Sequence, residues 1–112
     1  GRWGFRTLDL LVDRRVLIPR PETEVVAGLA IDSLPRGGVL VDLGTGSGAI
    51  ALSAAAERWP DVEVWATDAS TDALAVARAN LAGLDRTGRV VMRKLGRISR
   101  AELDAAASAA LK

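Results

Sequence analysis

The sequence predicts an α/β fold: a parallel sheet with flanking helices, preceded by an N-terminal β-hairpin. Short apolar runs at 39–41 and 62–66 have the character of strands that are buried on both faces. The segments that follow them, 49–58 and 71–84, carry apolar residues at helical spacing. This alternation of strands and helices is typical of parallel βαβ units.

The first twenty residues predict extended structure. Leu8, Leu10 and Val12 alternate with other residues, a period-two pattern that favours an edge strand or hairpin within 5–18. The two prolines of segment 19–21 then exclude regular structure between them.

A first helix is predicted to begin at Pro21 and to end before Pro35. Pro21 suits an early helical position, and Glu22 and Glu24 suit the positive end of the helix dipole. The apolar face of this helix is expected to consist of Val25, Val26, Leu29 and Leu34.

The second half of the chain repeats the pattern. Ser70 or Thr71 is expected to cap a helix that runs to about Leu84. Its apolar face consists of Leu74, Ala77 and Leu81. Residues 89–92 predict a third strand, and the capping-box pattern at 99–102 predicts a last, alanine-rich helix.

Composition excludes several classes of function. The chain has 112 residues, no cysteine and no histidine, so we expect no disulfide, no thiolate chemistry and no metal site. A net charge of +1 gives no reason to expect a nucleic-acid partner. Apolar runs too short to span a membrane predict a cytoplasmic protein.

A glycine-rich loop is the main candidate site. Gly44, Gly46 and Gly48 follow the first buried strand, where residues without Cβ let a ligand approach the backbone closely. Asp68 ends the next strand, and a carboxylate there can accept both hydroxyl hydrogens of a ribose. A tight turn without ligand, with Asp68 as a helix cap, is the alternative interpretation.

Asp42 bears on which nucleoside the loop would bind. The segment 44–49 can be aligned with a dinucleotide-binding pattern, which would indicate NAD. However, the carboxylate of Asp42 would repel a pyrophosphate and attract a cation. S-adenosylmethionine carries an ammonium and a sulfonium and no phosphate, so the sequence favours S-adenosylmethionine as cofactor.

Two segments resemble a known family. The sequence VLIPRPETE at 16–24, followed by DLGTGSGAIAL at 42–52, is similar to the HemK/PrmC family of release factor N5-glutamine methyltransferases. The resemblance covers residues 1–91 and implies part of a class I methyltransferase, Rossmann-like sheet. It implies a peptide chain release factor as the partner of the parent enzyme.

The resemblance also implies roles for individual residues. The loop Gly44, Thr45, Gly46, Ser47 and Gly48 would surround the methionine end of the cofactor. Asp68 would hold the ribose hydroxyls with Ala69 beside the adenine, and Arg20, Pro21, Glu22 and Thr23 would contact the cofactor from above.

The catalytic signature of the family, Asn-Pro-Pro-Tyr, is missing. The chain has no tyrosine, and Asn80 falls inside a predicted helix. We therefore expect a fragment with a lead-in segment 1–20, an incomplete cofactor-binding core 21–92 and a divergent tail 93–112. Such a fragment would bind the cofactor with little transfer activity, and its open sheet edge favours self-association.

Two other functions remain open from the sequence alone. One is the core of a class I methyltransferase that acts on rRNA or on adenine in DNA. The other is a nucleotide-binding module without catalytic activity.

Overall fold

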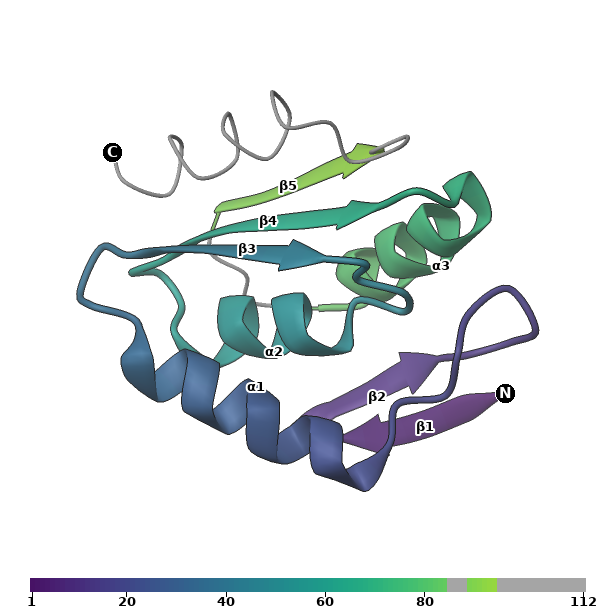
Figure 1. Cartoon of the computed structure of the whole chain (residues 1–112), viewed down its shortest axis with the longest axis horizontal. Coiled ribbons are helices and arrows are strands. Elements are labelled where there is room, and N and C mark those ends of the chain that lie inside the picture. Colours follow the sequence, from purple (N-terminus) through teal and green to yellow (C-terminus); the bar gives the residue numbers. More distant parts are fainter. Residues whose placement is uncertain (85–88, 95–112) are drawn as a thin grey trace.

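The computed structural model describes residues 1–84 and 89–94 (Figure 1). The elements, in chain order, are β1 Arg2–Phe5, β2 Leu8–Leu11, α1 Pro21–Ser33, β3 Val39–Leu43, α2 Ala49–Glu57, β4 Glu63–Asp68, α3 Thr71–Ala82 and β5 Arg89–Lys94. The hairpin β1–β2 and a parallel sheet in the order β3-β4-β5 confirm the predicted α/β fold. The last predicted helix lies outside the described residues.

The register of the sheet brings two acidic residues to one edge. Strand β3 pairs with β4 from Val39 opposite Glu63 to Leu43 opposite Thr67. Because the strands are parallel, the carboxyl ends of β3 and β4 meet at the same edge. Strand β3 is longer than predicted and includes Asp42, while Asp68 is the last residue of β4.

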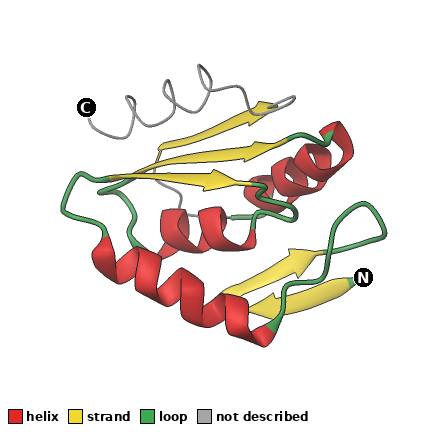
Figure 2. Cartoon of the chain, viewed as in Figure 1, coloured by secondary structure: helices red, strands yellow, loops and turns green. Residues whose placement is uncertain are grey.

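The helices and the hairpin lie on one side of the sheet (Figure 2). Leu40 and Val64 point from the strands into a core that they share with Ala51 and Ala54 of α2. Six of the nine residues of α2 are buried, and most of these are alanines. Their small side chains let α2 pack closely between the sheet and α1.

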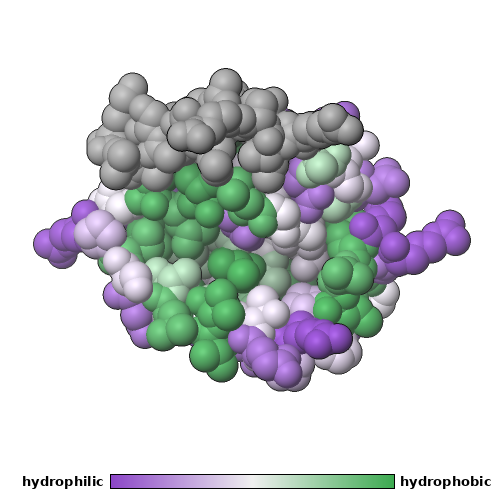
Figure 3. Space-filling view, in the orientation of Figure 1, coloured by the Kyte–Doolittle hydropathy of each residue, from purple (hydrophilic) through white to green (hydrophobic). Residues whose placement is uncertain are grey.

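Helix α1 buries a different face from the one predicted. Its buried residues are Ala27 and Ile31, whereas Val25 and Leu29 are 64% and 65% exposed and Val26 is also exposed. Figure 3 shows this apolar surface over the middle of α1. The pattern was ambiguous because apolar residues occupy both sides of the helix, and contact with α2 and the hairpin decides which side is buried.

The hairpin is fastened to the helices by Arg6 in the β1–β2 turn. The Arg6 guanidinium donates to both carboxylate oxygens of Glu57 in α2, at 2.6 and 2.7 Å. The backbone N–H of Arg6 donates to the Glu24 carboxylate in α1. Gly28 of α1 leaves room for the guanidinium, since a Cβ there would lie 2.9 Å from Arg6 Nη1.

Among residues 1–84 and 89–94, no helix is long and apolar enough to cross a membrane. The same residues contain no group of three acidic, histidine or cysteine side chains that could hold a metal ion.

Candidate cofactor-binding site

A cavity of about 330 Å³ opens at the carboxyl ends of β3 and β4. This volume is within the range of pockets that hold small molecules. The lining residues come from the segment before α1, the glycine-rich loop and the start of α3: Arg15, Val16, Leu17, Pro19, Thr23, Asp42, Gly44, Thr45, Gly46, Ser47, Ala49, Ile50, Asp68, Ser70 and Ala73. The cavity therefore joins both sequence segments that predicted the site.

The glycine-rich loop has a backbone that side chains disfavour. Gly44, Gly46 and Gly48 have φ values of +73°, +56° and +89°, all in the left-handed region. The backbone N–H of Thr45 donates to the Thr67 carbonyl at 2.7 Å, which fastens the loop to β4. The loop is thus held in one conformation, with its backbone facing the cavity.

Gly48 has a structural role at the start of α2. It is the N-cap of that helix and is buried. A Cβ at Gly48 would lie 2.9 Å from Leu52 Cδ1 and 3.4 Å from the Ala77 Cβ. Gly48 therefore leaves room for the Leu52 side chain of α2, and it does not line the cavity.

Asp68 connects the loop to the start of α3. Its Oδ2 accepts the Gly46 N–H and its Oδ1 accepts the Ser70 N–H, both at 2.9 Å. Ser70 in turn caps α3 by accepting the Ala73 N–H, as predicted. Each carboxylate oxygen can accept a further hydrogen bond, so Asp68 remains available to ribose hydroxyls at the cavity wall. Ala69 lies exposed beside it, outside the lining.

Asp42 is a partly buried carboxylate at the cavity. Burial raises its pKa, and the negative charge of Asp68 raises it further. A hydrogen bond from Thr45 Oγ1 at 2.8 Å and one from the Ala51 backbone N–H oppose this pKa shift by stabilising the ionised form. A cation in the cavity would stabilise the ionised form as well.

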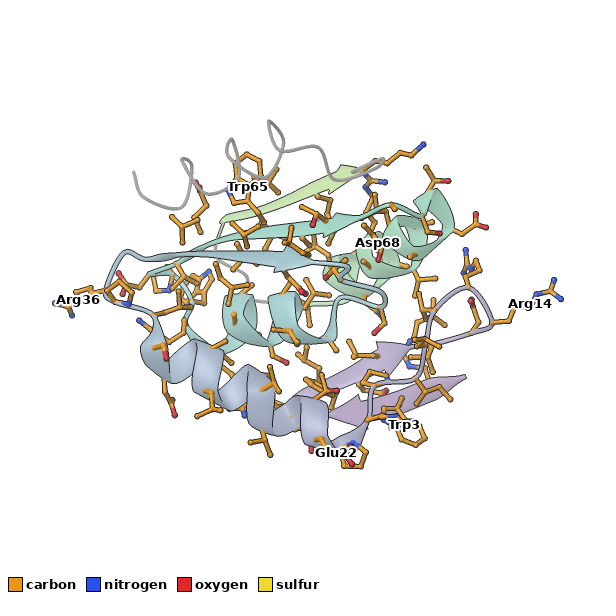
Figure 4. All side chains as sticks on the ribbon, viewed as in Figure 1. Trp3, Arg14, Glu22, Arg36, Trp65 and Asp68 are labelled. Atoms are coloured by element: carbon orange, nitrogen blue, oxygen red, sulfur yellow. The ribbon has the colours of Figure 1, made fainter. Side chains whose placement is uncertain are left out.

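Residues 20–23, at the start of α1, lie on two separate surfaces. Thr23 lines the cavity, whereas Arg20 and Pro21 line a separate hollow of about 120 Å³ together with Trp3. Glu22 is exposed, and Figure 4 places it away from Asp68. Of the four residues of this segment, the structure brings Thr23 to the cavity, and the contacts proposed for the other three stay predictions.

Asn80, which the sequence does not single out as a candidate, supports the site through a hydrogen bond to the glycine-rich loop. Its side chain is buried in α3, and it pairs with the backbone of Leu11: Oδ1 accepts the N–H at 2.6 Å and Nδ2 donates to the carbonyl at 3.0 Å. Nδ2 also donates to the Ser47 carbonyl at 2.9 Å. These partners are 69 and 33 positions away in the chain, so no local pattern could have indicated the role.

The sequence around this site matches a described family. Residues 25–107 match the family called methyltransferase small domain. The chain belongs to this family. The match crosses the boundary that we expect near residue 92, so the division of this methyltransferase domain into segments stays a prediction.

Two curated relatives of this methyltransferase domain share one name. It is 45% identical over 94 residues to a release factor glutamine methyltransferase of Caulobacter vibrioides, covering 82% of this chain and 32% of the relative. It is 52% identical over 83 residues to the protein of the same name from Gloeobacter violaceus, covering 72% and 29%. The chain thus spans about a third of the length of these relatives.

Solved structures share its fold. An S-adenosylmethionine-dependent methyltransferase from Thiobacillus denitrificans, in complex with S-adenosylhomocysteine, is 25% identical with a TM-score of 0.55, covering 73% of this chain and 32% of the other. Trm5b from Pyrococcus abyssi is 21% identical with a TM-score of 0.67, covering 83% and 27%. The predicted class I methyltransferase fold, present here in part, is therefore confirmed.

Proposed function

We propose that this methyltransferase domain binds S-adenosylmethionine in the cavity between the glycine-rich loop and Asp68. One observation carries the proposal: a partly buried carboxylate, Asp42, lines a cavity together with a second carboxylate, Asp68, at the end of the neighbouring strand. Two carboxylates at the strand ends favour a ligand that carries positive charge and ribose hydroxyls, and the Asp42 carboxylate beside the loop disfavours one that carries phosphates there.

The residues of the cavity fit this cofactor part by part. The left-handed backbone of Gly44 and Gly46 leaves room for the methionine chain to pass close to the loop. Asp68 offers its remaining lone pairs to the ribose hydroxyls. The Asp42 carboxylate, in the cavity wall, stabilises the positive charge of the cofactor. When bound, the cofactor supplies an electrophilic methyl group.

For the whole protein, we propose transfer of that methyl group to the side-chain amide of a release factor glutamine. The names of the relatives support this acceptor. An amide nitrogen is a poor nucleophile, so the reaction depends on holding it in line with the methyl group. This chain lacks the Asn-Pro-Pro-Tyr sequence that would orient the amide. The chain alone therefore binds the donor without transferring its methyl group.

Incubation with methyl-labelled S-adenosylmethionine and a release factor tests this activity. The whole protein should label the release factor, this chain alone should not, and a release factor with its acceptor glutamine changed should stay unlabelled. Labelling of rRNA or DNA in place of the release factor would refute the proposed acceptor. Transfer by the chain alone would refute the need for the missing sequence.

Two further parts of the proposal concern the setting of the protein. We place its activity in the cytoplasm, where a release factor would be its substrate. We also propose that the isolated chain self-associates, since α1 exposes Val25, Val26 and Leu29 on one surface. Sedimentation of the chain over a range of concentrations measures this association.

A further inference from the structure

The described lining of the cavity contains one basic side chain in addition to its two carboxylates. Among the lining residues within 1–84 and 89–94, Asp42 and Asp68 are acidic, and Arg15 is the single basic residue. Arg15 lies in the segment between the hairpin and α1, whereas the two carboxylates lie at the ends of β3 and β4. The cavity is therefore divided by charge, with a negative wall at the strand ends and a positive group on the covering segment.

A neighbouring carboxylate holds the Arg15 guanidinium in place. Arg15 Nη2 lies 2.6 Å from Asp13 Oδ2, and Nε lies 3.0 Å from Oδ1. The backbone N–H of Arg15 donates to the same Asp13 Oδ1 at 2.9 Å. This ion pair occupies one edge of the guanidinium. Within the described part of the chain, no hydrogen bond engages Nη1, so the second edge stays open to another planar anion.

We propose that Arg15 binds the carboxylate of the methyl donor and thereby selects a donor that bears an intact amino acid end. The inference rests on the proposed function, since it concerns the same cavity. S-Adenosylmethionine has one anionic group, its carboxylate, and two cationic groups. Asp42 complements the cationic groups and Arg15 complements the anionic one, through the planar pairing that a guanidinium forms with a carboxylate.

The side chain is suited to selection because it contributes little to the fold. Arg15 is 40% exposed and pairs with a residue two positions away. Such a local, solvent-screened pair adds little to stability. Replacing Arg15 should therefore change ligand choice and leave the fold intact. Arg14, the next residue along the chain, points away from the molecule (Figure 4) and does not line the cavity. The variant Arg14→Gln therefore provides a matched control for the Arg15 variants.

The test compares two donors that differ in the carboxylate alone: S-adenosylmethionine and its decarboxylated analogue. Calorimetry measures both affinities for the unaltered chain and for the variants Arg15→Gln, Arg15→Lys and Arg14→Gln. The unaltered chain and Arg14→Gln should prefer the intact donor by about tenfold or more. Arg15→Gln should lose that preference, and Arg15→Lys should keep part of it because it retains charge without the planar fork.

Each outcome decides between the two proposals. If the unaltered chain binds both donors equally, or if Arg15→Gln weakens both by the same factor, the role of Arg15 is refuted and the proposed cofactor stands. If the unaltered chain binds neither donor, the proposed function is refuted together with this inference. Loss of the preference in Arg14→Gln would show that general positive charge, and not Arg15, selects the donor.

Discussion

The two walls of the cavity differ in how they are held. The wall at the strand ends, formed by the glycine-rich loop with Asp42 and Asp68, is tied into the sheet by backbone and side-chain hydrogen bonds. The covering wall, residues 15–23, contains exposed side chains, including Leu17 at 89% exposure. The first wall can fix the position of a ligand, whereas the second can select among ligands at small cost to the fold. Asn80 connects the two, since it holds both Ser47 and the hairpin that leads into the covering wall.

The largest effect is expected from breaking that connection. Asn80→Leu would leave the Leu11 N–H and the Leu11 and Ser47 carbonyls without their partner. Unsatisfied buried groups of this kind should lower the free energy of unfolding by on the order of 3 kcal/mol, which urea denaturation measures. Ser53→Ala is the control, because the buried Ser53 hydroxyl has no hydrogen-bond partner among the described residues. Equal stability of the Asn80 variant and the unaltered chain would show that the walls are independent.

A second variant acts on the fixed wall. Asp68→Ala removes the ribose acceptor and the bond to Gly46, and should weaken donor binding by about 1.5–3 kcal/mol in calorimetry. Asp32→Ala, which changes an exposed acidic residue of α1 outside this cavity, should leave the affinity unchanged. Undiminished affinity after the Asp68 change would show that the ribose lies elsewhere.

A third variant tests the partly buried carboxylate of Asp42. Because the Asp42 pKa is raised in the folded chain, the folded state holds more protons than the unfolded state above pH 3.8. Stability therefore falls as the pH rises from 3.8 through the raised pKa. Asp42→Asn should remove this fall, seen in unfolding curves from pH 4 to 8, and should weaken donor binding by about tenfold. A pH dependence identical to that of the unaltered chain would contradict the burial of Asp42.

The smallest effect on stability is expected from the Asp13–Arg15 ion pair, at the edge of the covering wall. Arg15 lowers the pKa of Asp13 to about 2. The pair therefore stabilises the fold above the unfolded pKa of 3.8, and that contribution is lost as the pH falls through 2. Since the pair is solvent-screened, Asp13→Asn should leave the melting temperature at pH 7 almost unchanged. A large drop in that temperature would show that the Asp13–Arg15 pair contributes substantially to the stability of the fold.

The same contrast explains what the sequence could predict. Strands, loop glycines, Asp68 and the Ser70 cap follow from local patterns, because each depends on neighbours a few positions away. The buried face of α1 and the role of Asn80 depend on contacts between distant segments. The sequence has apolar residues on both sides of α1, and it has no local signal for a side chain that bonds to a strand 69 positions away.

The choice of cofactor is the central claim, and one titration tests it most directly. S-Adenosylmethionine, S-adenosylhomocysteine and NAD are each titrated into the unaltered chain by calorimetry at pH 7. The account predicts binding of the first two and none of NAD, because the carboxylate of Asp42 beside the loop repels a pyrophosphate. Preference for NAD over S-adenosylmethionine would contradict it.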